Sequence, residues 1–188
     1  MIAEIDITHS CPRWDAALGD AAGLCRRAVF AVLHEVADKS PNQLPGESPV
    51  GLSDAADRSV EISIVLADDA TIADLNLQFR DREGATNVLS FPALPAENEP
   101  HYPAGPDGPP ALLGDVVLAF ETVAAEAEDQ GKPLGYHFTH LVIHGILHLL
   151  GYDHLDEAEA QTMEQLEIRV LGALGVPDPY AEESPFVA

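Results

Sequence analysis

Segments with strand-like alternation and segments with helical spacing are interspersed along the whole chain. Alternating apolar residues predict a half-buried strand, whereas apolar residues three and four positions apart predict a helix. Interspersed elements of both kinds predict an α/β (α+β) fold, with a small mixed four-stranded sheet and about five helices packed on it. The expected strands are residues 3–8, 59–67, 86–91 and 112–120, and the expected helices are residues 15–36, 69–79, 121–130, 134–150 and 156–174.

The chain has 188 residues, and one domain commonly holds about 100–200 residues. Hydrophobic residues make up 46% of the sequence, which argues against wholesale disorder. We therefore predict a single domain over residues 1–188. Two proline-rich stretches interrupt the pattern, and we expect long loops at residues 38–58 and 92–111.

Nine basic and 32 acidic residues give the chain a formal net charge of −23. That balance excludes a basic protein that coats nucleic acid with its whole surface, although it permits a local basic spot. No apolar run approaches the roughly 18 residues of a membrane span, and the N-terminal residues lack the basic start of a secretory signal. We therefore expect a cytoplasmic protein without membrane contact, in which Cys11 and Cys25 are ordinary reduced thiols.

Five of the eight histidines lie within 18 residues, around the end of the apolar helix expected at 134–150. His144 and His148 are four residues apart, so both imidazoles project from one helix face. Gly151 can take the left-handed conformation that ends a helix, after which the chain can fold back and bring His154 to the same point. Three protein ligands with one open position are typical of catalytic zinc, and we predict one zinc ion here. Other divalent transition metals also accept imidazole ligands.

The neighbouring histidines are harder to assign. His144 and His148 could also be packed in the core, because two histidines four residues apart on an apolar helix are often buried there. The third histidine, His154, is what favours a metal site. His140 lies one turn before His144, too far from His148 for all three to hold one ion. It could orient a ligand or contact a substrate, or it could be a buried histidine with a hydrogen-bond partner.

The three histidines have the spacing of the H-E-x-x-H-x-x-G-x-x-H run of metzincin peptidases, so the expected helix is metalloprotease-like. In those enzymes the glutamate is the general base. Gly145 stands at that position here, and a glycine cannot transfer a proton. Asp153 is the nearest acid, although aspartate at such a place is typical of a turn. Phosphodiester hydrolysis depends less on that glutamate, because a metal can polarise the phosphoryl oxygen.

A second group of polar residues follows the helix expected before residue 80. Arg80 and Arg82 could complement the helix dipole or clamp a phosphate through the guanidinium fork. We predict that Arg80 is a catalytic residue that stabilises charge on a phosphoryl group. Asn87 and Ser90 could bind substrate or satisfy the following strand. Asp115, an acid inside an apolar strand, could orient a ligand histidine or contact a helix or loop.

Four motifs stand out along the chain, namely LNLQFR…TNVLSFP at 75–92, LLGDVVL at 112–118, QGKP at 130–133 and HGILHLLGYDH at 144–154. With these motifs in this order, the chain resembles the YbeY family of bacterial rRNA maturation factors over about residues 59–180. One departure stands before the VLSFP strand, where Ala85 replaces the proline that the family commonly has.

The resemblance implies a metal-dependent, single-strand-specific endoribonuclease that acts in 16S rRNA 3′-end maturation and 70S ribosome quality control. It places the metal ligands at His144, His148 and His154, with zinc as the usual metal, and the family's arginine at Arg80. The implied partners are rRNA of the small ribosomal subunit and a ribosomal or assembly-factor protein, with no DNA.

Two other functions stay open at this stage. One is a non-catalytic ribosome assembly factor with a structural metal, and the other is a metallopeptidase. The net charge of −23 further predicts weak binding to bare RNA, because few phosphates can be neutralised by lysine or arginine. We therefore expect a protein partner to deliver the enzyme to its RNA.

Overall fold

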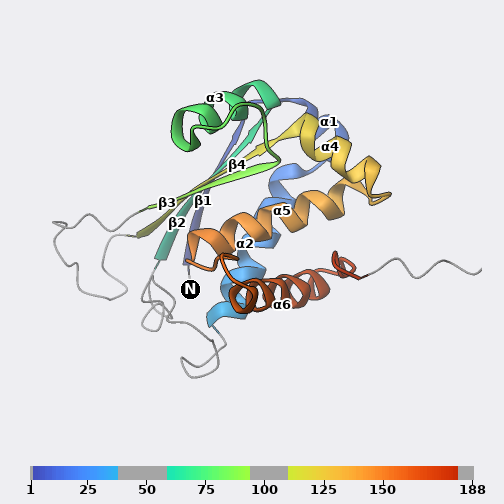
Figure 1. Ribbon diagram of the computed structural model, residues 1–188. Helices are drawn as coiled ribbons and strands as arrows, with labels where there is room; N and C mark the ends of the chain where they lie inside the picture. The colour runs from blue at the N-terminus through green and yellow to red at the C-terminus, as the bar shows by residue number, and fades with distance from the viewer. Residues whose placement is uncertain (1, 38–58, 94–109, 182–188) are drawn as a thin grey trace, which may run out of the picture.

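The computed structural model describes residues 2–37, 59–93 and 110–181 (Figure 1). The loops expected at 38–58 and 92–111 lie outside the described residues except at the ends of the second. There Pro92 closes a strand and Ala111 opens the next one. The elements in chain order are β1 (Ile2–His9), α1 (Arg13–Leu18), α2 (Ala21–Ala37), β2 (Ser59–Ala67), α3 (Asp69–Arg80), β3 (Val88–Pro92), β4 (Ala111–Ala119), α4 (Phe120–Asp129), α5 (Leu134–Leu149) and α6 (Glu157–Ala173).

The four strands form one sheet in the order β1-β2-β4-β3. β1 pairs with β2 and β2 pairs with β4 in parallel, whereas β3 pairs with β4 antiparallel. The predicted mixed four-stranded sheet is therefore confirmed. β3 is an edge strand, so one row of its backbone N–H and C=O groups has no neighbouring strand to pair with.

The helices cover the two faces of the sheet unequally. α2 and α5 pack on one face with α6 outside them, while α3 lies on the other face (Figure 1). Alternation along β4 divides its side chains between the two cores, because Val116 and Leu118 join the larger one and Val117 and Ala119 the smaller. Among the described residues, no helix has both the length and the apolar character needed to cross a membrane.

The first predicted helix, over residues 15–36, is wrong in one respect. The structure divides it into α1 and α2 at Gly19, whose φ of 75° is left-handed and ends α1. The Oδ1 atom of Asp20 then accepts a hydrogen bond of 2.8 Å from Gly23 N in the first turn of α2. The described residues therefore contain six helices where about five were expected.

Candidate metal centre

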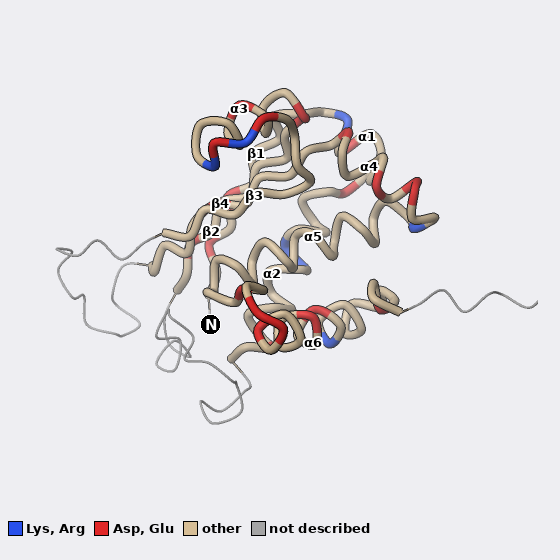
Figure 2. Tube along the Cα trace, in the orientation of Figure 1, with Lys and Arg blue, Asp and Glu red and all other residues tan. Residues whose placement is uncertain are grey.

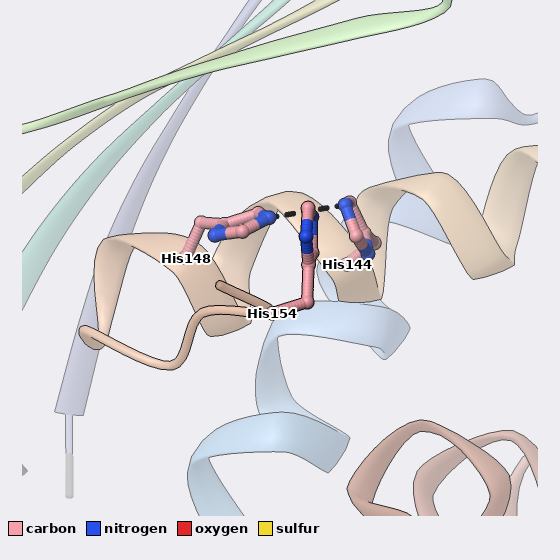
Figure 3. A group of neighbouring side chains, drawn as sticks. All are labelled: His144, His148 and His154. Carbon is pink, nitrogen blue, oxygen red and sulfur yellow. Dashed lines mark hydrogen bonds between the residues drawn. The ribbon is translucent and has the colours of Figure 1, made fainter. Parts of the chain in front are cut away.

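The two helical histidines of the predicted site face each other on α5. Their side chains are partly exposed on an otherwise buried helix, and the Nε2 atoms of His144 and His148 lie 3.1 Å apart (Figure 3). The sequence accounts for this arrangement, because residues four apart on a helix lie one turn above each other on the same face.

The third histidine comes from the turn that follows α5. Gly151 has a φ of 85°, and its backbone N–H donates a hydrogen bond to His148 O at 3.0 Å. The chain then folds back over the end of the helix and presents His154 beside the pair (Figure 3). One nitrogen from each of His144, His148 and His154 lies within 4.8 Å of the others. The predicted convergence of these three residues is therefore observed.

The outer nitrogens of both helical histidines lie near carboxylates. His144 Nδ1 lies 2.8 Å from Oε1 of Glu167, and His148 Nδ1 lies 3.8 Å from Oδ1 of Asp153. An imidazole with its proton on Nδ1 keeps its lone pair on Nε2, so these contacts favour two Nε2 lone pairs that face each other.

The ionisation of these groups matches this picture. Burial, with a further contribution from the neighbouring His144, lowers the pKa of His148 from 6.5 to about 4 against the opposing effect of Asp153. Burial alone would raise the pKa of Glu167, but hydrogen bonds from His140 and His144 bring it down to about 2. At neutral pH the site therefore combines a neutral His148 with a buried carboxylate, which is the state that metal binding requires of an imidazole.

The donor set fits a metal ion. Two lone pairs that face each other at 3.1 Å repel, unless a cation or a shared proton lies between them. In a tetrahedral site with metal–nitrogen distances of about 2.0–2.1 Å, neighbouring ligand nitrogens are about 3.3 Å apart. The spacing of His144 and His148 is close to that value, and His154 approaches from a third direction (Figure 3).

Glu167 and Tyr180 belong to this site, and the sequence reasoning missed both. The carboxylate of Glu167 reaches from α6 to His144 and also to His140, whose Nε2 lies 2.9 Å from Oε2. The hydroxyl of Tyr180 donates a hydrogen bond to the same oxygen. A signal for Glu167 was present, because it interrupts the apolar stripe of the last helix between Met163 and Val170. His140, for which the sequence permits two roles, shares this carboxylate with His144.

The structure does not place Arg80 in contact with the histidines. Its side chain is exposed at the end of α3, and among the described residues its hydrogen-bond partner is the carbonyl of Ser90, at 3.1 Å. The hydroxyl of Ser90 in turn donates to the carbonyl of Gly145 at 3.2 Å. Ser90 therefore connects Arg80 to the residue beside His144, across the free edge of β3.

Asn87 and Asp115 both lie away from the histidines, and Asn87 has structural partners. Asn87 Nδ2 donates to the carboxylate of Glu126 at 3.1 and 3.2 Å, and its Oδ1 accepts from Val88 N at 2.7 Å. The role suggested for Asp115 is wrong. It alternates with Val116 along β4, so it lies exposed on the sheet face opposite α5 and cannot orient a ligand histidine.

Position 145 faces the sheet and not the histidine cluster. A Cβ atom on Gly145 would lie 2.6 Å from Cγ1 of Val116 and 3.2 Å from Oγ of Ser90. A glutamate has no room there, so this helix cannot carry a base in the manner of a metzincin peptidase. Asp153 likewise has the local role expected of a turn residue, because its Oδ1 accepts from His154 N at 2.8 Å.

Fold and site together define a class, that of mixed α/β proteins with three histidines converging from one helix and the turn after it. Comparison with known proteins narrows the class. The model of the endoribonuclease YbeY family matches residues 49–175. This chain belongs to that family.

Individual relatives agree over most of the chain. Endoribonuclease YbeY of Paramagnetospirillum magneticum is 49% identical over 180 residues, which are 96% of this chain and 97% of that protein. The protein of the same name from Agrobacterium fabrum is 52% identical over 126 residues, 67% of this chain and 71% of its own length. The solution structure of TM1509 from Thermotoga maritima has a similar fold, with a TM-score of 0.50 at 21% identity. The match covers 98% of this chain and 100% of that protein chain.

Proposed function

We propose that this chain is a metal-dependent endoribonuclease that cleaves single-stranded RNA, with one zinc ion held by His144, His148 and His154. The observation that carries the proposal is the pair of Nε2 atoms of His144 and His148, which lie 3.1 Å apart with His154 beside them and with Glu167 at the outer nitrogen of His144. Membership of the endoribonuclease YbeY family supports the choice of RNA as the substrate.

A bound zinc ion supplies Lewis acidity, which polarises a phosphoryl oxygen and lowers the pKa of a water molecule. The chain contributes the rest. Glu167 holds the ring of His144 at its outer nitrogen, and Gly151 directs the turn that carries His154. This turn and α5 leave one side of the histidine cluster without a protein ligand among the described residues, which is where a phosphodiester would bind.

Arg80 is the proposed contact to the substrate phosphate. The carbonyl of Ser90 takes one donor of the guanidinium and holds the side chain at the edge of β3. An arginine has five N–H donors, so the others can bind phosphate oxygens and stabilise the charge that develops during cleavage. The hydrogen bond from Ser90 to the carbonyl of Gly145 links this edge to the helix that carries His144 and His148.

The biological role proposed is the maturation of the 16S rRNA 3′ end and the quality control of 70S ribosomes in the cytoplasm. Encounter with RNA is expected to be slow, because the chain carries a net charge of −23. The turn beside His154 adds to this repulsion, since it holds Asp153, Asp156 and Glu157. Acidic residues also gather where α6 begins (Figure 2). We therefore propose that a ribosomal or assembly-factor protein delivers the enzyme to its substrate.

Cleavage of end-labelled RNA tests the activity. The wild-type protein with zinc should cut a single-stranded oligonucleotide and spare the matching duplex, and EDTA should abolish cleavage until zinc is added back. Arg80→Ala should reduce the rate by about 10²–10³-fold, the cost of removing one preorganised charge-stabilising donor. Arg82→Ala is the matched control, because it removes an exposed arginine two residues away, and its rate should stay near that of the wild type.

Other outcomes point to other functions. Cleavage that survives in both His148→Ala and Arg80→Ala would overturn the proposal. Failure of the wild type to cut RNA, together with rescue of a bacterial strain lacking its own family member by the folded His148→Ala protein, would favour an assembly factor without catalysis. Accumulation of 16S rRNA with an unprocessed 3′ end in the unrescued strain tests the proposed biological role.

A further inference from the structure

Glu167 is a carboxylate with no contact to water. It lies on the buried face of α6, among Met163, Leu166 and Val170, and its side chain is 0% exposed. A buried charge is costly unless hydrogen bonds replace its hydration. A buried carboxylate in an apolar stripe therefore requires hydrogen-bond partners, and its histidine partners lie on another helix, α5.

Both oxygens of this carboxylate are occupied. Oε1 lies 2.8 Å from Nδ1 of His144, and Oε2 lies 2.9 Å from Nε2 of His140. Tyr180, from the segment after α6, donates its hydroxyl to Oε2, and its ring meets the ring of His140 edge-on at 5.6 Å. Contacts from α5 and from the C-terminal segment thus fix the orientation of the carboxylate, so it cannot rotate away from His144.

An ionised carboxylate can only accept hydrogen bonds, so the contact at Oε1 requires a proton on Nδ1 of His144. A neutral imidazole carries one proton, which leaves the lone pair on Nε2, the atom that faces His148. We propose that Glu167 is a positioning residue, which acts through His144 by holding this ring in the Nδ1–H tautomer with Nε2 presented to the metal. The role rests on the proposed metal-dependent function.

The two helical ligands differ in this respect. His148 Nδ1 lies 3.8 Å from Oδ1 of Asp153, a residue of the turn after α5. His144 depends on a side chain from a different helix. Loss of Glu167 should therefore release His144 and leave His148 in place, so the effect is specific to one ring.

Long-range ¹H–¹⁵N correlation spectra of the metal-free protein report the tautomer of each histidine directly. In the wild type, His144 should show a protonated Nδ1, and in Glu167→Gln the Nε2–H form should become populated. Zinc affinity, measured by competition with a chromophoric chelator, should fall by about 10–100-fold in Glu167→Gln, the usual cost of losing such a partner. Glu164→Gln is the matched control, since it removes an exposed negative charge one turn earlier on α6 and should leave both readouts unchanged.

The wild-type spectrum comes first, so the test does not depend on a variant that folds. An Nε2–H tautomer at His144 in the wild type would overturn the role of Glu167. The same conclusion would follow if folded Glu167→Gln kept both the wild-type tautomer and the wild-type zinc affinity. A wild-type protein that shows the Nδ1–H tautomer but binds no zinc would refute the proposed metal function and leave the positioning of His144 established.

Discussion

The hydroxyl of Ser90 donates a hydrogen bond of 3.2 Å to the carbonyl of Gly145, and this contact joins β3 to α5 beside His144. It requires the helix to approach the sheet closely. The missing side chain at position 145 permits that approach, because an added Cβ would lie 2.6 Å from a methyl group of Val116.

Gly145→Ala should destabilise the protein by about 1–3 kcal/mol, because the extra methyl group forces α5 away from β4. Urea unfolding at equilibrium measures the change. Gly172→Ala provides the comparison, since this glycine also lies inside a helix but has nothing within 4 Å of the added Cβ. That variant should gain up to about 1 kcal/mol from helix propensity. Similar changes in both variants would show that the close approach is not needed.

Addition of zinc should raise the melting temperature of the metal-free protein, because a ligand that binds the folded state stabilises it by mass action. The gain is about 2.7 kcal/mol when the free zinc concentration is 100 times the dissociation constant. His148→Asn should abolish this shift, whereas His34→Asn, which changes an exposed histidine on α2, should keep it. A zinc-dependent shift that persists in His148→Asn would place the ion elsewhere.

The turn after α5 gives a third prediction. Alanine at Gly151, whose φ is 85°, should cost about 1–2 kcal/mol of stability and also weaken zinc binding, because the turn positions His154. Gly19→Ala imposes a comparable strain at a φ of 75°, between α1 and α2 and away from the histidines. It should lower stability and leave zinc affinity unchanged. If both variants bound zinc alike, the turn would have no part in placing the third ligand.

Stability should also depend on pH through a histidine outside the metal centre. Burial lowers the pKa of His137 below its usual 6.5, against the opposing hydrogen bond to Glu126 at 2.8 Å. The unfolded chain therefore takes up this proton at a higher pH than the folded protein does. The contribution of His137 to the free energy of unfolding should be fully present above about pH 6.5. The free energy of unfolding should then decrease as the pH falls through that value.

Urea midpoints of the metal-free protein at pH 7.5 and pH 5.5 measure this dependence. His137→Gln should show a smaller loss between the two pH values than the wild type. His34→Gln should show the same loss as the wild type, because it removes an exposed histidine. A larger loss in His137→Gln would contradict the direction of the shift.

The strands, the mixed sheet and the histidine-bearing helix were predictable because their signals are local. Alternation along residues 59–67 and the four-residue spacing of His144 and His148 follow from backbone geometry alone. The break at Gly19 was missed because the apolar spacing of a helix continues across it, from Leu18 to Ala22. The left-handed conformation of Gly19 is what ends α1. The spacing of apolar residues carries no information about that conformation.

Contacts between distant elements were not predictable in the same way. The last helix shows an acid in its apolar stripe, but the sequence does not say that α6 packs beside α5 with Glu167 facing His144. The error at Asp115 has a similar origin. Alternation shows that neighbours on β4 face opposite ways, but only the packing of α5 shows which face carries the histidines.

The carboxylate that supports His144 lies on a helix that follows all three histidines in the chain. A growing polypeptide therefore exposes His144, His148 and His154 before α6 exists to steady them. The cluster gains its final geometry only when α6 docks on α5, and any later detachment of α6 removes the support again. Tight metal binding is thus expected only after α6 has docked, and the amide protons of α6 should exchange more slowly with solvent once the ion is bound.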